Sequence, residues 1–183
     1  MSKDLKRVLQ ELRQDHHNIA LLLGLLERES GRIHDGVEPD YELLHDIMRY
    51  MTVYPDTVHH PKEDRVYAEL KTVRPDLSSG LARITVDHRN IVESGLRLRD
   101  EFASIDSGNM VRRNTIVDKA QNYVNTLRSH MQWEELDLFR RIDEMIAAGH
   151  TRFDAANYSS AADPVFGPEV ERQFGRLART IHQ

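Results

Sequence analysis

The segment Tyr123–Phe139, YVNTLRSHMQWEELDLF, carries a histidine and a glutamate four residues apart. A stripe with steps of three and four runs through it: Ile116, Ala120, Tyr123, Leu127, His130, Glu134 and Leu138. This spacing is typical of one face of an α-helix that packs on a core. We therefore expect His130 and Glu134 to point inward. Burying a carboxylate is costly unless it is paired or binds a metal, so the pair predicts either a buried His–Glu hydrogen bond or part of a metal site.

Length and composition fit one domain with a filled core, because the chain has 183 residues of which 39% are hydrophobic. The absence of cysteine excludes a disulfide scaffold and a thiolate metal site. No signal sequence or long apolar segment occurs, so we expect a cytoplasmic protein without a membrane partner. The net charge of −5, with both signs interspersed, disfavours nucleic acid as a partner. The ten histidines are the most unusual feature of the composition.

The first helix is expected from Asp4 to Glu29, with Ser30 and Gly31 as its stop signal. Its seam has the alternating four and three spacing of a bundle helix: Leu5, Leu9, Leu12, His16, Ile19, Leu23 and Leu26. His16 lies on this seam. His17 falls beside it and is expected at the boundary of the core, in a supporting position.

After a polar loop over residues 31–39, a second helix is expected from about Asp40. Its buried side is formed by Leu44, Ile47, Met48 and Met51. Pro55 and Pro61 each remove a backbone donor, so a kinked or broken helix is expected between Tyr54 and Pro61. The pattern then resumes on one face with His59, Glu63, Val66 and Leu70.

The alternative pair in this helix is His60 with Asp64. Its track continues to Tyr67 and Lys71 and is less apolar. The pattern therefore favours His59 as the inward residue.

The third helix is expected from Leu77 to Ile105, with the seam Leu81, Ile84, His88, Ile91, Gly95, Leu98 and Phe102. It offers one histidine, because Ile84 and Val92 flank His88. The fourth helix continues to about Ala148. Four helices with short connections predict an all-α, up-down-up-down four-helix bundle.

We expect residues 1–148 to form this bundle, and residues 149–183 to form a loop and a fifth helix, from about Pro168, packed against it. Four further histidines are expected at the surface, in loops, on polar faces or at the chain end: His34, His45, His150 and His182.

The seam residues can be compared by height, since a helix rises about 1.5 Å per residue. This places six candidate metal ligands in one layer: His16, His59, Glu63, His88, His130 and Glu134. Mutual hydrogen bonds would satisfy four imidazoles and two carboxylates poorly in an apolar core. Two divalent metals bridged by the carboxylates would satisfy all of them.

Four segments give the chain a resemblance to the hemerythrin-like proteins with a histidine–histidine–glutamate cation-binding domain. They are DHHNI around His16, HHPKED around His59 and Glu63, DHRNI around His88, and HMQWEE around His130 and Glu134. Together they cover nearly Ser2 to Ala147. The resemblance implies two non-haem iron ions, oxo- or hydroxo-bridged, with Glu63 and Glu134 as bridging ligands and the four histidines as terminal ligands.

The third and fourth helices depart from the oxygen-carrying members of that family. Those members have a second histidine one turn from the first in the third helix, and an aspartate at the end of the last motif. Here Ile84 and Val92 flank His88, and Glu134 replaces the aspartate. The departure implies that water, a nearby tyrosine or His60 completes one iron, and it argues against reversible oxygen carriage.

Two classes of function follow. One is a di-iron protein that binds or reacts with dioxygen, nitric oxide or peroxide, as a monomer or homodimer. The other is a non-enzymatic module that binds metal or senses oxygen, redox state or iron. A bundle with a structural zinc is a weaker third interpretation.

Overall fold

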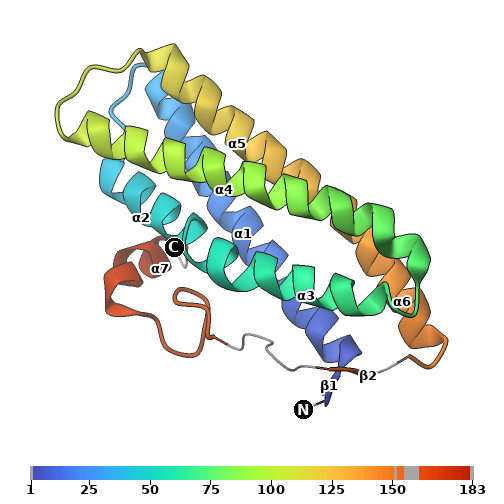
Figure 1. Cartoon of the computed structure of the whole chain (residues 1–183). Helices are drawn as coiled ribbons and strands as arrows, with labels where there is room; N and C mark the ends of the chain where they lie inside the picture. The colour runs from blue at the N-terminus through green and yellow to red at the C-terminus, as the bar shows by residue number, and fades with distance from the viewer. Residues whose placement is uncertain (1, 151, 155–160, 182–183) are drawn as a thin grey trace.

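The computed structural model describes residues 2–150, 152–154 and 161–181. Figure 1 shows four long helical rods that run in alternating directions. In chain order they are α1 (Leu5–His34), then α2 with α3 (Tyr41–Met51, His60–Leu70), then α4 (Ser78–Asp106), then α5 with α6 (Arg113–Trp133, Arg140–Ala147). The predicted all-α, up-down-up-down bundle is confirmed.

Two of the rods contain a π-helical turn where the others are regular. η1 (Pro55–His59) joins α2 to α3, and η3 (Glu134–Phe139) joins α5 to α6. At the first turn the His60 N–H donates to the carbonyl of Pro55, five residues back. Pro61, which has no N–H, follows directly, so it cannot make the α-helical bond that would tighten the turn. The interruption predicted between Tyr54 and Pro61 is therefore a widened turn.

The core consists of two apolar clusters with a polar layer between them. Leu12 and Ile84 belong to one cluster, while Ile19 and Ile91 belong to the other. His16 lies between Leu12 and Ile19 along α1, and His88 occupies the same place along α4. The predicted seams are buried throughout, except that the side chain of Leu81 is outside the described residues.

The first helix ends later than predicted. Ser30 and Gly31 lie within α1, which continues to His34. The chain then turns at Gly36, which has φ of 76° and whose following residue, Val37, donates to the carbonyl of Arg32. A left-handed glycine that closes such a bond is a common helix terminator. Gly31 is an ordinary helical residue.

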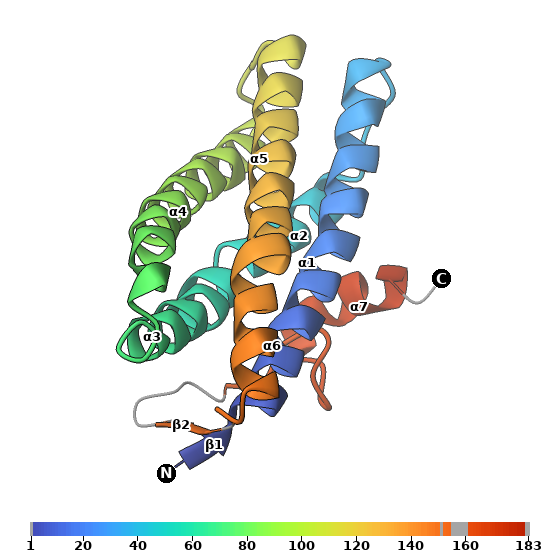
Figure 2. The ribbon, with the colours of Figure 1, turned by 90° about the vertical axis from the view of Figure 1, so that its right-hand side faces the viewer.

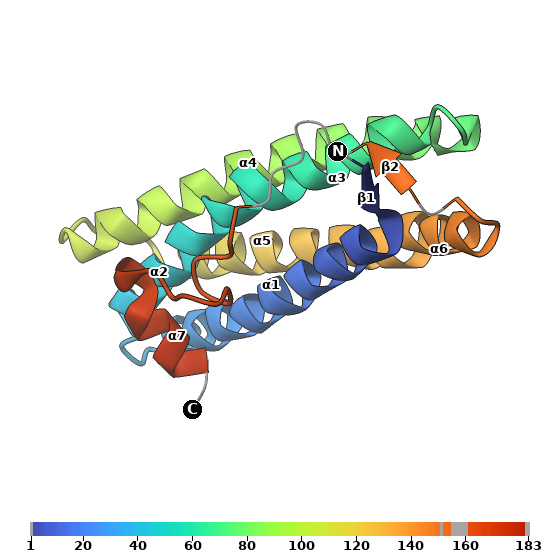
Figure 3. The ribbon, with the colours of Figure 1, turned by 90° about the horizontal axis from the view of Figure 1, so that it is seen from below.

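The C-terminal segment packs against the bundle, but its helix is shorter than predicted. A 3₁₀ turn, η4 (Arg172–Phe174), leads into α7 (Gly175–Ile181), so the predicted start at Pro168 was wrong. Phe174 and Leu177 are buried in the core, whereas Val170 is exposed. Figure 3 shows α7 beside α2. A division of the chain into domains at residue 148 stays a prediction.

A short antiparallel ribbon, which the sequence did not predict, joins the two ends of the bundle's chain. β1 (Ser2–Asp4) pairs with β2 (Arg152–Asp154), as Figure 2 shows at the foot of α1 and α6. A 3₁₀ turn, η2 (Pro75–Leu77), precedes α4. Among the described residues, no helix has the length and apolar character needed to cross a membrane.

Candidate metal centre

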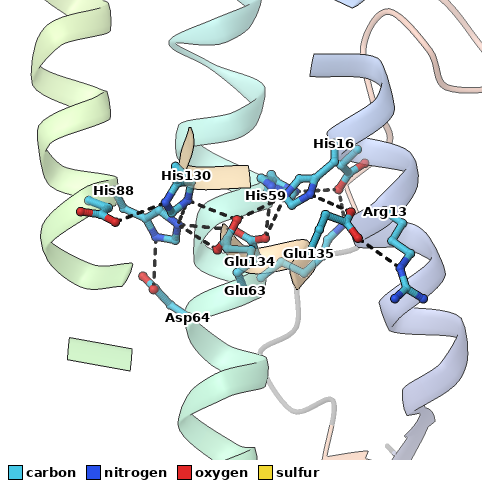
Figure 4. Close-up of polar contacts among 12 residues, drawn as sticks. Arg13, His16, His59, Glu63, Asp64, His88, His130, Glu134 and Glu135 are labelled. Atoms are coloured by element: carbon cyan, nitrogen blue, oxygen red, sulfur yellow. Dashed lines mark hydrogen bonds and ion pairs between the residues drawn. The ribbon is translucent and has the colours of Figure 1, made fainter. Parts of the chain in front are cut away.

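The structure brings the six predicted ligands together in the polar layer. All are buried, and both glutamates have no exposed surface: His16, His59, Glu63, His88, His130 and Glu134. They come from all four rods, and their polar ends converge between the helices (Figure 4). The heights expected from the sequence therefore agree with the arrangement in space.

Each glutamate faces histidines on both sides of the centre. Glu63 Oε1 lies 3.3 Å from His16 Nε2 and 3.4 Å from His59 Nε2, while its Oε2 lies 3.4 Å from His88 Nε2. Glu134 Oε2 lies 3.3 Å from both His16 Nε2 and His130 Nε2, and its Oε1 is 3.9 Å from His88 Nε2. A carboxylate with its two oxygens turned to different nitrogen donors has the arrangement needed to bridge two metals.

His60 joins the centre as a further imidazole. It is 3% exposed, stacks on His88 with ring centroids 4.2 Å apart, and lies edge-on to His130. His88 Nε2 and His130 Nε2 are themselves 3.1 Å apart. The preference for His59 over His60 was therefore incomplete, because both are buried.

An outer ring of carboxylates faces the Nδ1 atom of every one of these five imidazoles. The distances are 3.1 Å for His16 to Glu135, 3.1 Å for His59 to Asp15, 3.4 Å for His60 to Asp56, 3.2 Å for His88 to Asp64 and 3.6 Å for His130 to Asp87. Of these contacts, those of His16 and His59 are hydrogen bonds, whereas Nδ1 of His60, His88 and His130 makes none within the described residues. An acceptor at Nδ1 favours a proton there and leaves the lone pair on Nε2, which is the usual arrangement of a metal-bound histidine.

Two of these outer carboxylates have partners of their own. Asp15 accepts from Lys62 Nζ at 3.0 Å and from the Tyr54 hydroxyl at 3.2 Å, and all three residues are buried. Glu135 is paired with Arg13, at 3.4 Å. The orientation of His16 and His59 is thus fixed from outside the centre as well as by packing.

The inner atoms have too few partners for a purely hydrogen-bonded core. Within the described residues, no hydrogen bond is made by either side-chain oxygen of Glu63 or Glu134, or by Nε2 of His16 or His60, and all six atoms are buried. An unpaired buried polar group costs about 1–3 kcal/mol. These nitrogen and oxygen donors fit divalent metal ions, which would pair with all of them at once.

The histidines differ in how readily they carry a proton. Burial opposes charge on His16, but the carboxylates of Glu134 and Glu135 outweigh it and raise its pKa well above the usual value. Burial also opposes charge on His88, yet Asp64 and Glu63 raise its pKa to about 10. Burial lowers the pKa of His60 to about 4 and that of His130 to about 2.

The two glutamates share their charge unequally. Burial raises the pKa of Glu134 to about 8, and the negative charge of Glu63 adds to this effect. Burial opposes ionisation of Glu63 too, but the imidazoles of His59 and His16 lower its pKa well below the usual value. One glutamate therefore stays charged at neutral pH while the other largely holds a proton, because two adjacent carboxylates resist double ionisation.

Three groups of side chains within the described residues could hold a metal ion. Their ligand atoms lie within 4.8 Å of one another in each group: His16, His59 and Glu63; Glu63, His88, His130 and Glu134; and His60, His88 and His130. The first group lies on one side of the carboxylates and the other two on the opposite side. Glu63 belongs to both sides.

The sequence model of the hemerythrin HHE cation-binding domain matches residues 7–154. The chain belongs to this family. Comparison with curated proteins and with solved structures gives no match. The hemerythrin HHE match spans every residue of the centre described above, from His16 to Glu134. Membership of a cation-binding family agrees with the grouping of histidine and glutamate donors in the polar layer.

The remaining histidines of this hemerythrin HHE chain lie away from the centre. His17, His34 and His150 are exposed, His45 is half-buried, and His182 lies outside the described residues. The expectation that His17 supports the centre was wrong. Asp15, on the other side of His16 in the sequence, supports it by accepting from His59.

Proposed function

We propose that the chain binds two non-haem iron ions in the polar layer and that this pair binds or reacts with a small oxidant such as dioxygen, nitric oxide or peroxide. The observation that supports the proposal most strongly is the pair of buried glutamates, whose four oxygens face imidazole nitrogens on both sides and have no hydrogen bond within the described residues. Family membership supports the binding of a cation at this place.

The proposed division of ligands follows the two sides of the centre. His16 and His59 would hold the first iron, while His60, His88 and His130 would hold the second. Glu63 and Glu134 would be shared. In this assignment His60 supplies the imidazole that the third helix lacks, so the second iron has five protein donors and the first has four. The first iron is therefore the one with more room for an external ligand.

Iron supplies redox chemistry, because it can exchange electrons with a small oxidant. The chain supplies the surroundings of that chemistry. The two apolar clusters limit the access of water to the layer, and Glu135 and Asp15 keep the Nε2 atoms of His16 and His59 directed inward. The negative charges of Glu63, and of Glu134 once metal displaces its proton, would offset part of the charge of the metals.

Optical stopped-flow measurements on the reduced, iron-loaded protein test this function. Mixing with air-saturated buffer or with peroxide should convert the spectrum to that of an oxidised di-ferric protein, and nitric oxide should perturb the spectrum of the reduced form. Apoprotein treated in the same way is the control. A colour change with dioxygen that reverses completely under vacuum would identify an oxygen carrier and contradict a reactive centre. An iron-loaded protein that responds to none of the three would contradict the proposal as a whole.

A further inference from the structure

Tyr67 is a buried phenol in the wall of the metal centre. It lies on α3, four residues after Glu63, and is 1% exposed. Residues four apart lie one above the other on a helix, so Tyr67 occupies the turn next to Glu63. Its ring belongs to the apolar cluster that contains Leu138 and Phe139, and Phe139 of that cluster stacks on His16 with ring centroids 5.0 Å apart.

The hydroxyl of Tyr67 has no hydrogen-bond partner among the described residues, although it is fully buried. Two other buried tyrosines are paired: Tyr50 donates to Asp163 Oδ2 at 2.8 Å, and Tyr54 donates to Asp15 Oδ1 at 3.2 Å. Buried phenols usually find a partner, because an unmade hydrogen bond leaves the cost of desolvation uncompensated. Tyr67 is thus a donor that lacks an acceptor within the part of the chain that the structure describes.

Tyr67 lies one helical turn after Glu63 on α3, and the charges of the buried glutamates act on its hydroxyl. Burial raises the pKa of Tyr67 well above its usual value, and the negative charges of Glu134 and Glu63 raise it further. The phenol therefore keeps its proton and can act as a donor. Neither glutamate accepts from it, since all four carboxylate oxygens make no hydrogen bond within the described residues. An atom that enters the centre can supply the acceptor.

We propose that Tyr67 donates a hydrogen bond to the exchangeable ligand of the metal pair, which is water at rest and a small anion or oxidant when that ligand replaces water. Tyr67 is a positioning residue in this role and does not bind the metal. The inference rests on the proposed function, because it requires metal ions in the polar layer. It assigns selectivity for small ligands that accept a hydrogen bond to one side chain of α3.

Thermal unfolding of Tyr67→Phe, with and without metal, tests the inference through a readout that is independent of activity. In the apoprotein the substitution removes an unpaired hydroxyl, so the melting temperature should equal or exceed that of the wild type. In the iron-loaded protein it removes a hydrogen bond, so the melting temperature should fall below that of the wild type by about 2–4 °C.

Tyr50→Phe is the matched control, because its hydroxyl bonds to Asp163, away from the centre, in either state. It should lower the melting temperature equally with and without metal. Azide, a small anion that accepts hydrogen bonds, gives a second readout: Tyr67→Phe should bind azide about tenfold more weakly, and Tyr50→Phe should bind it as the wild type does.

Equal effects of Tyr67→Phe on the apoprotein and the loaded protein, with unchanged azide affinity, would overturn the inference and leave the proposed function intact. Loss of a phenolate-to-iron absorption band in Tyr67→Phe would also overturn it, since Tyr67 would then be a ligand. Failure of the proposed function has a different signature: the wild type itself would take up no pair of metal ions, and the inference would fall with it.

Discussion

Two pairs of adjacent histidines, one in α1 and one at the junction of η1 and α3, differ in their burial. In the first pair His16 is buried and His17 is exposed; in the second pair His59 and His60 are both buried. Neighbours on a regular α-helix point about 100° apart, so only one of two can lie on a narrow seam. The second pair lies where the π turn η1 ends, and a π turn takes up one residue more than an α turn. The inward face therefore shifts by one residue between His59 and His60.

The other rod with a π turn also brings two adjacent polar residues to the centre. Glu134 is the first residue of η3 and has no exposed surface, while its neighbour Glu135 reaches His16 Nδ1 at 3.1 Å. The regular helices α1 and α4 each give the centre one imidazole, His16 and His88. The π-containing rods give it the other five inward groups. A widened turn thus allows a short stretch of chain to place several polar groups in one layer.

The largest expected effect comes from the glutamates that follow the histidines on these two rods. Glu63→Gln and Glu134→Gln should each abolish binding of the metal pair, because one neutral amide replaces a carboxylate that faces both sides of the centre. Glu144→Gln is the matched control, since Glu144 is paired with exposed Arg140 at the surface. Metal content per chain after desalting is the measurement. Metal retention in either variant at the level of the control would remove that glutamate from the site.

The next largest effect on metal content is expected from substitutions in the two histidine pairs. His60→Ala should reduce the metal content by about one ion per chain, because it removes one of three imidazoles from the second side. His17→Ala, which changes the exposed member of the other pair, should keep the wild-type content and melting temperature. Equal metal content in the two variants would show that the π turn does not bring a further ligand to the centre.

A smaller effect, on the pH dependence of metal affinity, comes from the different protonation of His16 and His60. The pKa of His16 is raised, so this imidazole is protonated at neutral pH without metal, whereas His60, with a pKa of about 4, is already neutral. Metal must displace protons from His16, His88 and Glu134. Affinity should therefore fall as the pH is lowered, by about tenfold per pH unit for each proton released.

Calorimetric titration with metal, in buffers of different ionisation enthalpy, counts these protons at pH 7. When metal binds to the side of the centre that contains His16 and His59, His60→Ala should release the same number of protons as the wild type, because His60 is already neutral at this pH. A metal affinity that is constant between pH 6 and pH 8 would show that the imidazoles and carboxylates of the apoprotein are not protonated as described.

The sequence predicted the bundle and the buried seams well, because a spacing of three and four residues fixes which face of a regular helix is apolar. The seam residues from Leu5 to Leu26 on α1, and those from Ile116 to Leu138 on α5 and η3, are buried as expected. It predicted the six candidate ligands for the same reason, and the structure brings them together. Their role as ligands stays a prediction.

The sequence pattern did not predict the residues whose position depends on the widened turn or on contacts between rods. The sequence pattern placed His60 beside the seam, whereas the structure buries it directly after the π turn η1. Asp15 hydrogen-bonds His59 and Asp64 lies 3.2 Å from Nδ1 of His88, in each case across to another rod, so no spacing along the chain reveals these contacts. Tyr67 shares its track with Lys71, which makes that track look less buried in the sequence than it is at Tyr67.

The central claim is that one buried layer holds two metal ions. Protein produced in iron-replete cells and purified without chelators should contain about two irons per chain by elemental analysis, because the inward donors form two groups that share a bridging carboxylate. The oxidised protein should show the optical spectrum of an oxo-bridged di-ferric site. One zinc per chain with no iron, and no such spectrum, would contradict the claim.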